Sequence, residues 1–175
     1  GAWCCTARWR AAALARGTPL HMLMDDHELV DNWSRDLLLC GPAERELSTN
    51  ALAAYQVFQR AHGPDALAAD GHDTCFNLGG AGFYSLNTRI QRQRAPERRL
   101  LTASQWQALE DWLLAEQARG RQPKFILSGS VLAPGLREYA GQPSPRASDN
   151  WQLSSAERAR LLRFIRDRGI HNVVF

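Results

Sequence analysis

The stretch KFILSG, residues 124–129, decides the fold that we expect for this chain. Its apolar side chains continue almost without alternation, which is typical of a strand buried on both faces. An apolar pattern of helical spacing precedes it in residues 103–119, and residues 155–168 precede the similar run HNVVF, residues 171–175, in the same way. A helix followed by a buried strand, twice over, predicts an α/β protein in which helices cover a sheet.

Both of these helices begin with the sequence pattern of a capping box. Thr102 and Gln105 have the spacing of this motif, and so do Ser154 and Glu157. In a capping box the Ser or Thr side chain accepts a hydrogen bond from the later backbone N–H, and the Glu or Gln side chain accepts one from the earlier backbone N–H. We therefore expect reciprocal caps at both helix starts.

The N-terminal half of the chain predicts two more helices and a strand. Residues 3–16 and 43–62 carry apolar side chains at helical spacing, and glycine and proline follow both patterns. Residues 20–24 predict a short strand between these helices.

A hairpin is expected in the middle of the chain. The short runs 74–78 and 83–86 flank the glycine cluster 79–82, which predicts an antiparallel pair with a turn of roughly three to five residues. Further on, residues 130–153 form a loop too long for a plain connection, and such loops are often functional.

Composition excludes several classes of protein. The 175 residues have the length of one domain, and 45% of them are hydrophobic and 22% charged, which is ordinary globular usage. No apolar run approaches the roughly 20 residues that a membrane-spanning helix needs. The formal net charge of +3 does not indicate nucleic acid binding. The oligomeric state stays open.

The cysteines indicate neither a disulfide framework nor a zinc site. The four cysteines, Cys4, Cys5, Cys40 and Cys75, include no C-x-x-C pair, so neither a zinc ribbon nor a set of disulfides is indicated and we expect buried free thiols. The chain shows no secretory signal, but it does not begin with Met, so the cytoplasm and the cell envelope both stay open.

The densest basic stretch is RIQRQRAPERR, residues 89–99. It could hold an anionic substrate. Clustered charge is usually solvated surface, however, and a solvated loop is the interpretation that we favour.

The segment MDDHELVDNW, residues 24–33, gathers acids around a histidine. Asp25, Asp26, His27 and Glu28 follow the apolar end of the expected strand, and α/β proteins bind ligands beyond the carboxyl ends of their strands. Carboxylate and imidazole together suit calcium, iron and other divalent ions. A helix cap or an ion-pair network would use the same residue types, so a metal site and a structural cluster both stay open.

This segment resembles the D-D-H-E-x-x-(D/N)-N-W signature of the alkaline phosphatase D (PhoD-like) family of metallophosphoesterases. Four more segments resemble later motifs of that family in the same order: ALAAYQVFQRAHGPD at 51–65 its next helix, FYSLNTRIQR at 83–92 its L-D-T-R-x-x-R strand end, LLTASQWQALEDWL at 100–113 its L-G-x-x-Q-x-x-W-L helix, and DNW at 149–151 its D-x-W loop. The resemblance covers almost the whole chain.

The resemblance implies a four-layer α/β/β/α sandwich and a metal centre that hydrolyses phosphate esters, either phosphomonoesters or phosphodiesters. The metals would be calcium, iron, manganese or zinc. Cations roughly 3.5–4 Å apart in such sites generate a hydroxide and stabilise the attacking and leaving oxygens of the displacement.

The resemblance also implies roles for single residues. Asp26 would ligate a metal, Asp25 would be a second ligand, and His27 would contact the phosphate or protonate the leaving group. Glu28 would orient His27. Five further residues would lie around these ligands or contact the substrate: Asn32, Trp33, Arg89, Asp149 and Trp151. The two tryptophans could equally pack under their loops.

Departures from the family pattern leave an alternative. Asn87 stands where the family has Asp in L-D-T-R. The family's first and last metal motifs would lie before residue 1 and after HNVVF, so we expect a central segment of the domain, with little or no phosphatase activity on its own. A non-catalytic α/β relative that serves binding or assembly is the alternative. A hydrolase using Ser128 or Ser130 is disfavoured because no G-x-S-x-G motif occurs.

Overall fold

A computed structural model describes residues 17, 21–67, 72–94, 98–120, 122–133, 151 and 154–175 of the chain. The expected helix 3–16, Cys4, Cys5, Asp149 and most of the loop 130–153 lie outside these residues. Within the described part no helix is both long and apolar enough to cross a membrane.

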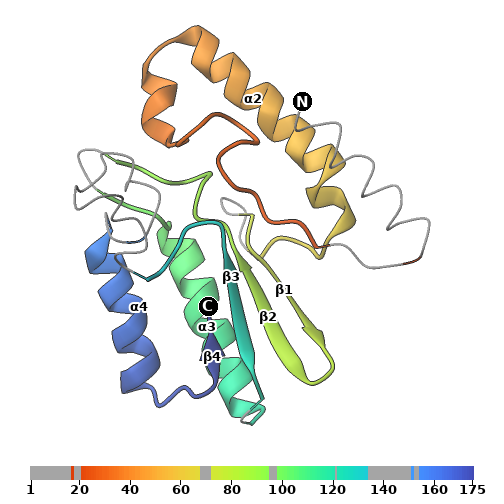
Figure 1. Cartoon of the computed structure of the whole chain (residues 1–175), viewed down its shortest axis with the longest axis vertical. Coiled ribbons are helices and arrows are strands. Elements are labelled where there is room, and N and C mark those ends of the chain that lie inside the picture. Colours follow the sequence, from red (N-terminus) through yellow and green to blue (C-terminus); the bar gives the residue numbers. More distant parts are fainter. Residues whose placement is uncertain are drawn as a thin grey trace, which may run out of the picture.

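The described residues form one mixed sheet of order β1-β2-β3-β4 (Figure 1). β1 (Thr74–Leu78) pairs antiparallel with β2 (Ala81–Leu86), and β2 pairs parallel with β3 (Lys124–Ser128). β3 pairs parallel with the short β4 (Val173–Val174). The predicted α/β class is therefore confirmed.

The described residues also form five helical elements. They are η1 (Arg35–Leu39), α2 (Pro42–Phe58), η2 (Arg60–His62), α3 (Ala103–Ala118) and α4 (Ser155–Asp167), of which η1 and η2 are short 3₁₀ helices. Figure 1 shows α3 and α4 beside the sheet and α2 beyond the upper ends of the strands. The predicted helices 43–62, 103–119 and 155–168 are confirmed, although the first ends at Phe58 and gives way to the separate turn η2.

The main core lies between the sheet and the helices α3 and α4. It is built of Tyr84, Leu86, Leu100, Leu101, Trp106, Leu109, Trp112, Leu113, Ile126, Trp151, Leu161 and Ile170. Trp151 is 1% exposed, so of its two predicted positions the packed one is observed. On the other face of the sheet three phenylalanine rings stack across neighbouring strands, Phe76 on Phe83 and Phe83 on Phe125, each pair with centroids 4.9 Å apart.

The hairpin turn is shorter than the sequence predicts. Only Gly79 and Gly80 lie between the strands, and both have positive φ, 57° and 82°. A two-residue turn with positive φ at both positions matches the twist of an antiparallel pair, and glycine adopts this conformation without steric cost. β2 therefore begins at Ala81 instead of at residue 83.

The strand predicted at 20–24 is wrong for its described part. Residues 21–24 carry no strand, although Met24 is fully buried. The inner strands β2 and β3 already have two neighbours each, and the carbonyl oxygen of Met24 lies close to Gly129, just past the end of β3. The segment therefore crosses the ends of the strands without pairing with them, and of residues 21–24 only Met24 is buried.

The two predicted capping boxes have different outcomes. Thr102 Oγ1 accepts from the backbone N of Gln105 at 3.3 Å, and Gln105 Oε1 accepts from the backbone N of Thr102 at 3.1 Å, as predicted. Ser154 makes no side-chain cap hydrogen bond. Glu157 instead accepts from Leu100 N at 2.5 Å and from Trp106 Nε1 at 3.1 Å, so its carboxylate links α4 to the start of α3.

The solvated loop predicted at 89–99 is also wrong at its start. Arg89 and Arg92 are each 2% exposed, and Gln91 is buried as well. The guanidinium of Arg89 pairs with Asp25 of the acidic segment, as described below. Cys40 and Cys75 are free thiols, as predicted, but the expected burial is wrong for Cys40, which is exposed, and Cys75 is only half-buried.

Candidate active site

The acidic segment meets the sheet where β2 and β3 end. A Cβ atom on Gly129, the first residue after β3, would lie 3.1 Å from the carbonyl oxygen of Met24 and 3.2 Å from Asp25 Oδ1. Only glycine allows this approach without displacing one of the two. The residues after β2 and β3 are tied together by the buried hydrogen bond from Thr88 Oγ1 to Ser130 Oγ, 2.9 Å long. The acidic segment therefore lies beyond the carboxyl ends of β2 and β3, whereas the sequence analysis placed it at the end of a strand 20–24 that does not form in residues 21–24.

Hydrogen bonds within the segment fold it into a compact turn. The backbone N atoms of Leu29 and Val30 both donate to Asp26 O at 2.9 Å, and the backbone N of Asn32 donates to Asp26 Oδ2 at 2.8 Å. Asn32 has a φ of 58°, a left-handed conformation that asparagine adopts more readily than most residues. The turn wraps around Asp26, which is 3% exposed.

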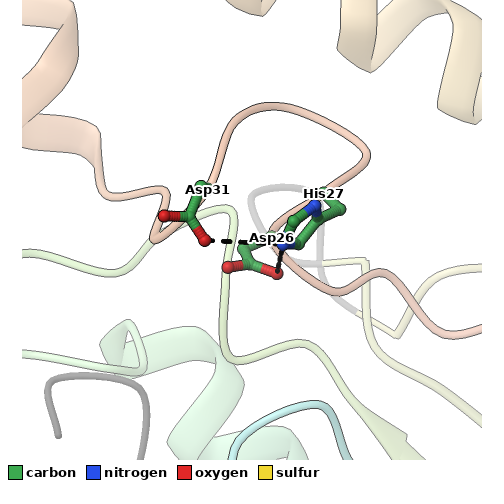
Figure 2. Close-up of side chains that lie close together, drawn as sticks. All are labelled: Asp26, His27 and Asp31. Atoms are coloured by element: carbon green, nitrogen blue, oxygen red, sulfur yellow. Dashed lines mark ion pairs between the residues drawn. The ribbon is translucent and has the colours of Figure 1, made fainter. Parts of the chain in front are cut away.

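Three side chains of this turn converge. His27 Nε2 lies 3.8 Å from Asp26 Oδ1 and 3.4 Å from Asp31 Oδ1. One ligand atom from each of the three residues lies within 4.8 Å of the other two. Figure 2 shows the imidazole of His27 and the carboxylate of Asp31 turned toward Asp26. The side chains of His27 and Asp31 are 78% and 65% exposed, so the group is open to a bound molecule.

The donor set fits a cation. Atoms that each coordinate one ion at about 2.0–2.6 Å lie no more than roughly 5 Å apart, which matches the spacing of the three side chains. Two carboxylates and an imidazole suit the borderline and hard ions, calcium, iron, manganese and zinc. Asp26 Oδ2 is held by Asn32 N, while Asp26 Oδ1 lies on the side of the histidine.

Asp25, which the sequence analysis expected as a second ligand, makes an ion pair. Its Oδ1 atom accepts from Nε and Nη2 of Arg89, at 2.7 and 2.6 Å. Glu28, expected to orient His27, accepts from the backbone N of Asp25 at 3.0 Å. The roles predicted for Asp25 and Glu28 stay predictions, and the observed contacts of both stabilise the turn.

Asp31 is the residue that the sequence analysis missed. It lies four positions after His27, and that spacing could have indicated a contact if the segment had been taken as a helical turn. Asn32, also predicted near the site, donates from Nδ2 to Asp31 Oδ2 at 2.9 Å. Trp33 is 2% exposed and packs in a second core with Met24, Leu29, Tyr55 and Ile90.

Asn87 caps the turn that follows β2. Its Oδ1 atom accepts from the backbone N of Arg89 and of Ile90, both at 3.0 Å. These bonds need one side-chain oxygen, which Asn and Asp both supply. The Nδ2 atom of Asn87 is buried and has no hydrogen-bond partner among the described residues, so these residues use only the oxygen of its side chain.

The buried carboxylate of Asp73 links the elements that form this edge of the sheet. Asp73 is 0% exposed, and its Oδ1 atom accepts from Asn87 N at 2.7 Å and from Gln105 Nε2 at 3.0 Å. Its Oδ2 atom accepts from Tyr84 Oη at 3.1 Å. Burial, and then the charge of Asp73, raise the pKa of Tyr84 well above its ordinary value, so Tyr84 remains the donor. Asp73 thus joins β1, β2 and α3 beneath the site.

Comparison with known proteins gives one match. The family model described as PhoD-like phosphatase matches residues 7–175. No curated protein matches the chain, and no solved structure does. The family is one of phosphatases that are generally metal-dependent, and this agrees with the resemblance seen in the sequence.

Proposed function

Because the chain belongs to the PhoD-like phosphatase family, we propose that it is a metal-dependent phosphoric ester hydrolase whose active site includes the turn from Asp25 to Asp31. Family membership supports a phosphatase function in general. The further step, to a metal-dependent phosphomonoesterase or phosphodiesterase, rests on one observation. It is the convergence of Asp26, His27 and Asp31 at the carboxyl edge of the sheet.

Asp26 is the first choice as a metal ligand. A buried carboxylate is costly unless it is paired, hydrogen-bonded or bound to a cation. The backbone N of Asn32 supplies a hydrogen bond to Oδ2, and a cation on Oδ1 would balance the charge. Asp31 Oδ1 would be a second ligand from the same turn. A bound cation supplies positive charge for the phosphate oxygens and makes a water molecule a stronger nucleophile.

His27 is proposed as the proton donor. Its side chain is 78% exposed and therefore within reach of a bound ester, whereas Asp26 beneath it is not. When water attacks phosphorus and the bond to the leaving oxygen breaks, that oxygen gains negative charge, and the imidazolium would transfer its proton there.

Metal content tests the proposal most directly. The purified protein and its Asp26→Ala variant would be compared by elemental analysis for calcium, iron, manganese and zinc, and assayed with p-nitrophenyl phosphate and its bis-ester. Asp65→Ala is the matched control, since Asp65 is an exposed acid outside the segment 25–31. We expect metal, together with whatever turnover the wild type has, to be lost only in Asp26→Ala. Equal metal content in both variants would contradict the assignment.

A further inference from the structure

The basic segment 89–94 lies along the acidic segment and is bonded to it at several points. Arg89 pairs with Asp25 at one end of the acidic segment. The other contacts lie further along: Arg35 N to Arg92 O at 2.8 Å, Arg94 N to Asp36 Oδ2 at 2.6 Å, and Arg94 Nη2 to Asn32 O at 2.6 Å. Of these contacts, Arg89 reaches the side chain of Asp25 and Arg94 Nη2 reaches the backbone of the acidic turn at Asn32, while Arg92 O and Arg94 N bind Arg35 and Asp36 just after the turn.

Arg94 is connected to Asp26 through a single residue. Its Nη2 atom donates to the carbonyl oxygen of Asn32 at 2.6 Å, and the backbone N of the same Asn32 donates to Asp26 Oδ2 at 2.8 Å. Asn32 is held with φ at 58°, outside the conformations that most residues prefer. A backbone in this region persists only when its surroundings hold it there. The guanidinium of Arg94 holds the carbonyl end of this residue.

We infer that Arg94 is a positioning residue that fixes the carboxylate of Asp26 by way of Asn32. The inference extends the proposed function, in which Asp26 holds a cation, and names a residue from a distant part of the chain that prepares this ligand. Groups that hydrogen-bond to metal ligands fix their orientation, and their loss typically weakens metal binding by roughly 10- to 100-fold. Arg94 would act in this way through one intervening peptide.

The direction in which cation affinity changes when Arg94 is replaced distinguishes positioning from simple electrostatic repulsion. Arg94 is a positive charge near a proposed cation site, so removing it would by itself strengthen cation binding. If Arg94 positions Asp26, removing it weakens cation binding instead. The substitution Arg94→Met keeps the length and the apolar part of the side chain and removes only the charged donor. The matched control is Arg45→Met, because Arg45 Nε also donates to a backbone carbonyl, that of Leu38 at 2.9 Å, away from the acidic turn.

Two measurements test the inference on the full protein. Calorimetric titration with Mn²⁺ should show a dissociation constant roughly 10- to 100-fold higher for Arg94→Met and unchanged for Arg45→Met. Hydrogen exchange of the metal-free protein should show the Asn32 amide exchanging roughly 10-fold faster in Arg94→Met, while amides of β2 keep their protection. The second readout does not need a metal.

The outcomes separate this inference from the proposed function. If the wild-type protein binds no metal, the proposed function fails, and the exchange of Asn32 still decides whether Arg94 positions the turn. Unchanged exchange at Asn32 overturns the inference whatever the metal result. Faster exchange with unchanged or tighter Mn²⁺ binding also overturns it, because the fixed geometry would then not matter to the ligand. Loss of protection throughout β2 would mean a structural role only, and this too overturns it.

Discussion

Replacement of Asp73 by alanine should destabilise the protein more than any change at its surface. The carboxylate is fully buried and accepts hydrogen bonds from Tyr84 Oη, Asn87 N and Gln105 Nε2. A buried donor that loses its acceptor costs about 1–3 kcal/mol. Gln105 Nε2 keeps a second acceptor, Asn87 O at 2.8 Å, so its loss is small. Tyr84 Oη and Asn87 N have no other acceptor among the hydrogen bonds described here. We therefore expect Asp73→Ala to lower the free energy of unfolding by about 3–5 kcal/mol.

Asp73→Asn distinguishes hydrogen bonding from charge. The amide keeps an oxygen for Asn87 N and Gln105 Nε2, and its NH₂ group can donate to Tyr84 Oη, which then accepts. We expect a loss of about 1–2 kcal/mol, clearly below that of alanine. Urea unfolding at neutral pH, followed by tryptophan fluorescence, measures both variants. Asp111→Ala, at an exposed carboxylate that accepts only from Gln107 on the same helix, should stay within about 0.5 kcal/mol of the wild type. A loss below about 1 kcal/mol for Asp73→Ala, or equal losses for both variants, would refute the reasoning.

Three further predictions concern the site and its surroundings. His27→Ala should lower turnover of p-nitrophenyl phosphate by roughly 10²- to 10⁴-fold with metal content near normal; loss of metal would make His27 a ligand instead. Gly129→Ala should destabilise the protein by about 1–3 kcal/mol in urea unfolding, because the new Cβ would lie 3.1 Å from Met24 O, and unchanged stability would contradict the close approach. Burial, and next the charge of Arg60, lower the pKa of His72 below its ordinary 6.5, so the unfolded chain takes up the proton first. Stability should therefore fall as the pH drops through 6.5 and level off below the folded pKa; His72→Phe should show a shallower fall, and identical pH curves would rule this out.

The sequence predicts those parts of the fold that depend on neighbours along the chain. The capping box at Thr102 forms because its two partners are three positions apart and need nothing else. The same spacing at Ser154 fails, since Glu157 is taken by Leu100 N and Trp106 Nε1, more than fifty positions away. A local sequence pattern shows which hydrogen bonds can form. Whether they form depends on whether the same side chain bonds instead to a residue distant in sequence.

The run before Asp25 shows the same limit for strands. Its apolar side chains predict burial, which holds for Met24, while Met22 and Leu23 are half-buried. Apolarity does not state which backbone a segment pairs with, and this one pairs with none of the strands.

In the candidate site, too, some residues could be predicted from the sequence and some contacts could not. Asp26 and His27 are adjacent, and their chemistry is evident from the segment itself. The contacts of Arg89 with Asp25 and of Arg94 with Asn32 join positions 64 and 62 residues apart. No periodicity in either segment connects them, and a run of arginines on its own resembles a solvated surface.

The order of the strands has a consequence for how the chain assembles. Because the sheet order β1-β2-β3-β4 follows the order of synthesis, each new strand adds to the free edge of the one before it, and no strand must be inserted between two others. The hairpin β1–β2 closes over two residues and can form as soon as it leaves the ribosome. The acidic turn emerges earlier still, but Arg89, Arg94 and Gly129 come much later in the chain. Until these residues are translated, the carboxylates of the turn remain hydrated, so the turn takes its final shape only after the chain up to residue 129 has emerged.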